Sequence, residues 1–194
     1  GKGKNGGDAL VVARQLIAMG KRVRVFLLHG HEAYRDESKQ NLEILLEQKN
    51  RPIVLDNVTP LEEFFGSASG PFLCVDGLLG IGFKGPLAGL FADVVDIING
   101  KTGYVIALDM PSGVDATTGQ VIGQAIHADL TVAFGFAKIG HYIAPGAIHR
   151  GELCIVDIAL PPSFRKEGTI HAISKDSVAP LLQRRDRYGH KNSF

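Results

Sequence analysis

Two short hydrophobic segments of this chain each run into an aspartate and then into residues that cannot continue a regular strand. Tyr104–Leu108 is followed by Asp109 and then by Met-Pro-Ser-Gly. Phe72–Val75 is followed by Asp76 and then by a glycine-rich stretch. Proline and glycine interrupt regular strand pairing. Ligands of open α/β sheets bind in the crevice at the carboxyl ends of the strands. The repeated pattern therefore indicates a ligand site at one edge of a sheet.

The first two-thirds of the sequence alternates strand-like with helix-like periodicity, which favours a mostly parallel sheet with helices on both faces. Residues 1–8 are predicted to form a glycine-rich loop, with Asp8 capping the first helix. The expected helices cover residues 9–19, 38–49 and 87–99, with a helical turn at 61–65. The expected strands cover residues 23–28, 53–55, 72–75, 104–108, 130–134 and 153–156, and Pro161-Pro162 is expected to close the last one.

Composition is that of a folded domain without a strong electrostatic partner. The chain has 194 residues, of which 45% are hydrophobic and 21% charged, with a net charge of +1. With a net charge near zero we expect no nucleic acid as a partner, and because no apolar run reaches about 18 residues we expect no membrane either. Cys74 and Cys154 lie in apolar runs, which predicts small buried side chains, a reducing compartment and hence a cytoplasmic location. We expect one domain over residues 1–162 and a solvated, polar linker over residues 163–194.

Two glycine-rich segments are candidates for binding phosphate. Gly1, Gly3 and Gly6 satisfy G-x-G-x-x-G, but the strand expected at 23–28 does not end in the acidic residue that holds a ribose, so hydride transfer is poorly supported. A helix beginning at Asp8–Ala9 would still favour an anion. The loop at residues 80–85, which contains Lys84, could cradle phosphate or be an ordinary surface loop.

Three residues on separate loops offer hard oxygen ligands. Asn5, Asp76 and Ser112 supply an amide carbonyl, a carboxylate and a hydroxyl. Such a set suits an alkali or alkaline-earth cation rather than zinc. His29 and His31 have no supporting ligands at metal-binding spacing, so we interpret them as solvated loop residues.

Four segments in this order resemble the YjeF N-terminal domain family, the NAD(P)H-hydrate epimerases. These segments are residues 3–8 (Gly-Lys-Asn-Gly-Gly-Asp), 75–82 (Val-Asp-Gly-Leu-Leu-Gly-Ile-Gly), 108–115 (Leu-Asp-Met-Pro-Ser-Gly-Val-Asp) and 134–147, which contains Phe-Gly-Phe-Ala-Lys-Ile-Gly. The resemblance implies a three-layer α/β/α Rossmann-like sandwich that binds hydrated nicotinamide cofactor. Lys4 and Ala9 replace an asparagine and a glycine of the family pattern, and the family's N-terminal helix and first strand have no counterpart in this sequence.

The resemblance also implies roles for individual residues. Potassium (K+) would be the cofactor, with Asn5, Asp76 and Ser112 as its ligands. The substrate, hydrated NADH or NADPH, would contact two loops and the strand-end aspartate: Lys4, Asn5, Gly6, Gly7, Asp8, Gly80, Ile81, Gly82, Phe83, Lys84, Gly85, Pro86 and Asp109. A homodimer is a further expectation. Arg187–Lys191 resembles the entry to a dehydratase domain, which would make this chain part of a bifunctional repair protein.

The chemistry expected of such a substrate is proton transfer at a hemiaminal carbon. We predict that Asp109 is the acid/base and that Lys138 is a second catalytic residue, either as a proton donor or as a positive charge near the substrate. A non-catalytic nucleotide-binding or scaffold module of the same fold is the alternative. A nicotinamide-dependent oxidoreductase is the weakest interpretation. The presence of Asn5, Asp76, Asp109 and Ser112 together favours the enzyme.

Overall fold

A computed structural model describes residues 1–68, 70–101, 103–161, 163, 170–173 and 175–181. The chain divides into two compact units, Gly1–Ala159 and Leu160–Phe194. In the second unit a short helix α6 (Lys175–Val178) is followed by a 3-10 turn (Ala179–Leu181). The predicted dehydratase entry at residues 187–191 lies outside the described residues.

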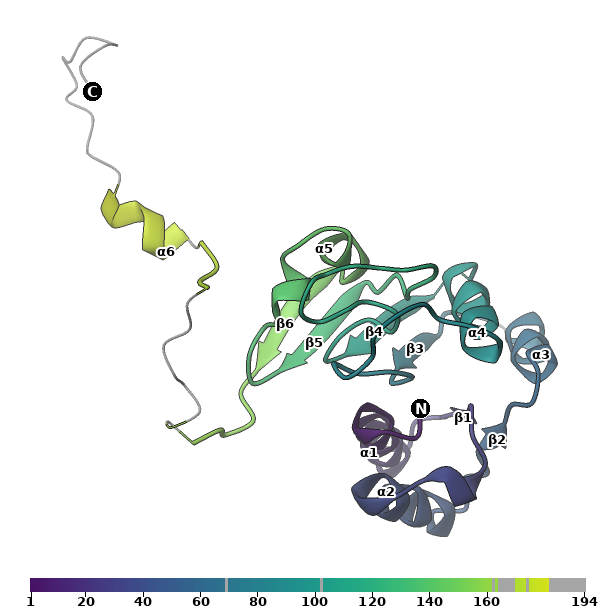
Figure 1. The fold of residues 1–194 in the computed structure, drawn as a ribbon. Coiled ribbons are helices and arrows are strands. Elements are labelled where there is room, and N and C mark those ends of the chain that lie inside the picture. Colours follow the sequence, from purple (N-terminus) through teal and green to yellow (C-terminus); the bar gives the residue numbers. More distant parts are fainter. Residues whose placement is uncertain (69, 102, 162, 164–169, 174, 182–194) are drawn as a thin grey trace. The chain divides into compact units, whose positions relative to one another are not determined.

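The first unit is built on a four-stranded parallel sheet with the order β3-β4-β5-β6 (Figure 1). The strands are β3 (Leu73–Asp76), β4 (Tyr104–Leu108), β5 (Leu130–Phe134) and β6 (Glu152–Val156). Asp76 lies beside Ala107, and Leu108 lies beside Val132. This register brings the ends of β3 and β4, and the aspartates there, to one edge of the sheet. A separate parallel pair joins β1 (Phe26–Leu27) to β2 (Ile53–Val54).

The helices pack around two of the three hydrophobic clusters found among the described residues. The helices are α1 (Lys4–Ala18), α2 (Asp36–Glu47), α3 (Thr59–Ser67), α4 (Leu90–Asn99) and the short α5 (Gly146–His149). Two 3-10 turns are η1 (His31–Ala33) and η2 (Ile139–His141). Apolar residues of α4, among them Val95, form one core with Val105 and Ala107 of β4. Leu10 of α1 and Leu45 of α2 belong to the second core. The parallel pairing and the alternation of strands with helices confirm the predicted Rossmann-like α/β class.

The predicted start of the first helix was wrong. α1 begins at Lys4, with Gly3 as its N-cap, so Asp8 lies inside the helix and does not cap it. Gly6 and Gly7 are poor helix formers, but both are buried here. A Cβ on Gly7 would come within 3.3 Å of Ser38 at the start of α2. Close packing of the two helices therefore outweighs the low helix propensity of the glycines.

Three other local predictions were also wrong. β1 covers only residues 26–27 of the six predicted for it. β6 ends at Val156, the predicted last residue of that strand, so Pro161-Pro162 does not close it as predicted. Cys154 is exposed rather than buried, because β6 is the outer strand of the sheet. Cys74 is half-buried, and this burial raises the pKa of its thiol to about 12. None of the helices in the described ranges is both long and apolar enough to span a bilayer.

Candidate functional site

The carboxylate of Asp76 lies at the end of β3 in a fully buried position. Its Oδ1 accepts hydrogen bonds from the Leu78 N–H at 3.0 Å and the Ser112 hydroxyl at 2.7 Å. Its Oδ2 accepts the Ser112 N–H at 2.8 Å. Two strand-end loops that are distant in sequence are therefore joined through one carboxylate.

Asn5 reaches the same place from the first turn of α1. Its Nδ2 donates to the Leu79 carbonyl at 2.7 Å, and the Leu79 N–H donates to the Ser112 hydroxyl at 2.9 Å. Asn5 is 8% exposed, and its Oδ1 is buried without a hydrogen-bond partner among the residues described. A buried carbonyl oxygen without a hydrogen-bond partner costs free energy, so Asn5 Oδ1 is a candidate to contact a bound ion or molecule. We refer to Asn5, Asp76 and Ser112 as the oxygen cluster.

Glycine is required where the β3 loop meets α1. A Cβ on Gly77 would lie 2.4 Å from the Cβ of Ala9, and one on Gly80 would lie 3.0 Å from the Cβ of Asn5. The absence of side chains lets the loop approach the helix closely enough for the Asn5 amide to reach the Leu79 carbonyl.

The electrostatics of the oxygen cluster favour a bound cation. Burial raises the pKa of Asp76, while hydrogen bonds from Ser112 and Leu78, and to a smaller extent the positive charge of the Gly1 amino group, oppose that shift. No lysine or arginine side chain among the described residues forms an ion pair with this carboxylate. A cation held by oxygen ligands would both offset the desolvated negative charge and provide a partner for Asn5 Oδ1.

Asp109 follows β4 directly and has a left-handed backbone, with φ at 62°. Its Oδ1 accepts the Phe134 N–H at 3.0 Å and forms an ion pair with the Lys138 ammonium group. Lys138 Nζ also donates to the Phe134 carbonyl at 3.2 Å. The side chains of Asp109 and Lys138 are 14% and 20% exposed, so both are largely enclosed while retaining access from outside. The two predicted catalytic residues, which are distant in sequence, are thus in direct contact.

His141 in η2 is fully buried and contacts the backbone of both residues of this pair. Its Nδ1 accepts the Lys138 N–H at 2.9 Å, and its Nε2 lies 2.9 Å from the Asp109 carbonyl. Reasoning from the sequence missed this residue. The available signal was a histidine three positions after the candidate lysine.

The charges of two further segments act on carboxylates near this edge of the sheet. Asp8 on α1 is exposed as a residue, but partial desolvation of its carboxyl, and then the charge of Asp109, raises its pKa. Hydrogen bonds from the N–H groups of Thr118 and Thr117 lower the pKa of Asp115, with a smaller contribution from the charge of Lys84.

Some of the predicted substrate-binding residues are buried, and others are exposed to solvent. Gly6 and Gly7 are buried between elements and do not line an open surface. Asp8, Ile81, Gly82, Lys84 and Pro86 are exposed, whereas Phe83 packs against the larger core. The backbone of the loop at residues 80–86 and the side chain of Lys84 are thus accessible to a ligand, while Phe83 holds the loop against the core.

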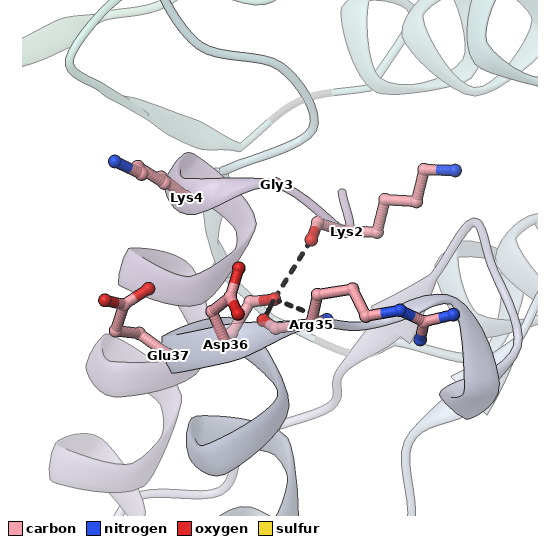
Figure 2. A pocket seen from close by; sticks show the side chains of 7 residues that line it. Lys2, Gly3, Lys4, Arg35, Asp36 and Glu37 are labelled. Carbon is pink, nitrogen blue, oxygen red and sulfur yellow. Dashed lines mark hydrogen bonds between the residues drawn. The ribbon is translucent and has the colours of Figure 1, made fainter.

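Lys4 lies at the edge of a shallow pocket between the starts of α1 and α2. The pocket is lined by Lys2, Gly3, Lys4 and residues 35–38 (Figure 2). At this pocket the Ser38 hydroxyl donates to the Lys2 carbonyl at 3.0 Å, which links α2 to the segment before α1. The side chain of Lys4 is exposed, so the lysine at this position does not crowd the oxygen cluster.

Known proteins resemble this chain in sequence and in fold. Residues 1–140 match the family model described as YjeF-related protein N-terminus. A bifunctional NAD(P)H-hydrate repair enzyme Nnr from Moorella thermoacetica is 36% identical over the whole chain, which spans 37% of that relative. An NAD(P)H-hydrate epimerase from Levilactobacillus brevis is 34% identical over 85% of this chain and 73% of its own length. The crystal structure of yeast YNL200c shares the fold, with a TM-score of 0.69 and 24% identity over 91% of this chain and 73% of that one.

Proposed function

The chain belongs to the family of the YjeF-related protein N-terminus, and we propose that it is an isomerase that interconverts the R and S forms of hydrated NADH and NADPH. The observation that carries the proposal is the enclosed Asp109–Lys138 pair at the end of β4, on the same loop as Ser112 of the oxygen cluster. The names of the relatives supply the substrate. The chain spans just over a third of the length of the bifunctional relatives.

The reaction inverts C6 of the hydrated ring, which bears a hydroxyl group next to the ring nitrogen. In one route the C6–O bond breaks as the hydroxyl takes a proton and leaves as water, and water then adds to the opposite face and loses a proton. In the other route the hydroxyl loses its proton as the C6–N bond breaks and the nitrogen is protonated. The resulting aldehyde rotates, and the ring closes with the proton movements reversed. Both routes need a group that gives and takes a proton within hydrogen-bond reach of the reacting hydroxyl or water.

Asp109 is that group in our proposal. A carboxylate held by Phe134 N–H and Lys138 has a fixed orientation, and its partial exposure lets it reach a substrate. The ammonium group of Lys138 stabilises the ionised carboxylate between proton transfers and can donate to a leaving hydroxyl.

We propose that Asn5, Asp76 and Ser112 hold potassium. The support is the buried Asn5 Oδ1 without a partner and the buried Asp76 carboxylate without a cationic side chain among the described residues. When bound, the ion supplies a positive charge close to the phosphate or ribose oxygens of the substrate. The residues themselves connect α1, the β3 loop and the β4 loop.

The substrate's phosphates are assigned to the segments around this edge. Lys4 and Lys84 are exposed cations on the start of α1 and on the loop at residues 80–86, and the backbone N–H groups at the start of α1 favour anions.

Three further expectations from the sequence stay predictions. A homodimer would be recognised by light scattering of the purified chain. A dehydratase domain acting beside this one would be recognised by the loss of both epimers in a coupled assay. A cytoplasmic location would be recognised by fractionation of the source cells.

The proposal is tested with a hydrate sample enriched in one epimer. Chromatography over time in the presence of the chain and potassium should show the second epimer accumulating faster than in buffer alone. Equal rates with and without the chain would refute the proposed activity.

A further inference from the structure

One buried histidine joins the backbones of the two residues to which we assign the chemistry. His141 is fully buried in η2, and its ring lies between the N–H of Lys138 and the carbonyl of Asp109. Its own carbonyl accepts Arg150 Nε at 2.6 Å, and Arg150 Nη1 donates to the Gly151 carbonyl at 2.7 Å. The backbone of His141 is therefore held by the segment leading into β6, while its ring contacts the end of β4.

The hydrogen bonds determine the tautomer of this ring. An N–H group can only donate, so Nδ1 carries the lone pair that receives the Lys138 N–H. A carbonyl can only accept, so Nε2 carries the proton and donates to Asp109. A protonated imidazole has no acceptor and could not make the first bond. Burial lowers the pKa of His141, the charges of Lys138 and Arg150 add to that effect, and contacts with Asp109 oppose it.

The Asp109 backbone needs such support. Its φ of 62° places it in the left-handed region, which non-glycine residues adopt only when the surroundings hold them there. The neighbouring backbone bonds run from the Asp109 N–H to Val132 and from the Met110 N–H to Leu108. The Asp109 carbonyl is held by His141, so this bond sets the direction in which the chain leaves β4.

We infer that His141 is a positioning residue for the acid/base pair. Its Nε2–H fixes the Asp109 peptide in the conformation that aims the carboxylate at Lys138 and the substrate. Its Nδ1 holds the start of η2, from which Lys138 extends. The inference rests on the proposed function for its catalytic consequence, and the backbone effect can be measured without any activity.

Two amide variants separate the two hydrogen bonds. In His141→Gln the terminal amide nitrogen reaches the place of Nε2 and can donate to the Asp109 carbonyl. In His141→Asn the side-chain oxygen takes the place of Nδ1 and can accept only the Lys138 N–H. His141→Phe removes both bonds and keeps an aromatic ring in the space.

We expect His141→Asn and His141→Phe to lower kcat by about 10- to 100-fold, because a small displacement of a catalytic group has effects of this size, and to leave KM nearly unchanged. His141→Gln should recover most of kcat although its melting temperature is close to that of His141→Asn. Equal kcat values for the Gln and Asn variants, or a loss of kcat that follows melting temperature across all three, would overturn the positioning role.

A second readout keeps the inference separate from the proposed function. The backbone carbon shifts of Asp109 in NMR spectra report its positive φ. They should be native-like in His141→Gln and altered in His141→Asn. If the unsubstituted chain fails to epimerise the hydrates, the proposed function is wrong, and these shifts alone decide the role of His141. Native shifts in all three variants would refute it.

Discussion

Replacing Asp109 by asparagine removes proton transfer and the ion pair with Lys138 while it keeps the size and shape of the side chain. The asparagine Oδ1 can still accept the Phe134 N–H, which Asp109 accepts at 3.0 Å. Asparagine also tolerates the left-handed backbone found here at φ 62°, whereas alanine would add strain of about 1–2 kcal/mol. The amide cannot exchange a proton with the substrate, and it leaves the Lys138 ammonium without its counter-charge.

The expected loss of activity follows from the size of general acid–base effects. Such catalysis contributes about 10²–10⁴-fold, which corresponds to about 2.7–5.4 kcal/mol of activation free energy. The effect on folding should be smaller. The Asp109 and Lys138 side chains are 14% and 20% exposed, so the ion pair lies between the buried and surface limits and its loss should lower the free energy of unfolding by about 1–3 kcal/mol.

The assay measures kcat for epimerisation by chromatography and the free energy of unfolding in urea for the same preparations. Asp93→Asn is the matched control, because Asp93 is an exposed carboxylate on α4 outside the site. It should retain the original kcat. A kcat within a few-fold of the unsubstituted chain in Asp109→Asn would remove Asp109 from the acid/base role.

Three other changes test the cation site, the buried histidine and the close approach of α1. Burial raises the pKa of Asp76, so the folded state binds a proton at this carboxylate more tightly than the unfolded state does, and the proton competes with a cation. Potassium should therefore raise the melting temperature more at about pH 8 than at about pH 5, and it should not raise that of Asp76→Asn. Equal shifts at both pH values, or a shift in the variant, would contradict the cation site. The pKa of His141 is lowered in the folded state, so the free energy of unfolding should fall as the pH drops below the unfolded-state pKa of about 6.5. Urea titrations at several pH values should show this pH dependence reduced in His141→Gln by up to about 1.4 kcal/mol per pH unit. An unchanged pH dependence would show that the folded state does not hold this histidine neutral. Gly77→Ala should destabilise the fold by about 1–3 kcal/mol because its Cβ would lie 2.4 Å from that of Ala9. Ala9→Gly alone should cost about 1 kcal/mol as a glycine inside a helix. The double variant should lose less stability than the sum of the two separate losses, whereas additive losses would argue against the contact.

The central strands could be predicted because their signals are local. Tyr104–Leu108 and Leu130–Phe134 are short runs of strand-forming residues between breakers, and the structure has both with the predicted bounds. The start of α1 could not be predicted in this way. Its glycines oppose a helix locally, and they are tolerated because the helix packs closely against Ser38 and the β3 loop.

The site required information about long-range contacts. Strand ends followed by aspartates indicated an edge of the sheet, and the structure joins Asn5, Asp76 and Ser112 there. Spacing alone did not pair Lys138 with Asp109; that assignment came from the family resemblance. The exposure of Cys154 depends on which strand is outermost, which a single sequence does not reveal.

The most direct test of the account is a proton NMR time course on hydrated NADH or NADPH enriched in one epimer, with the chain present and with or without potassium. The C6 proton signal of the starting epimer should decay into that of the other at a rate proportional to protein concentration, faster with potassium and slowed about 10²–10⁴-fold by Asp109→Asn. Signals that change no faster than in protein-free buffer would contradict the account.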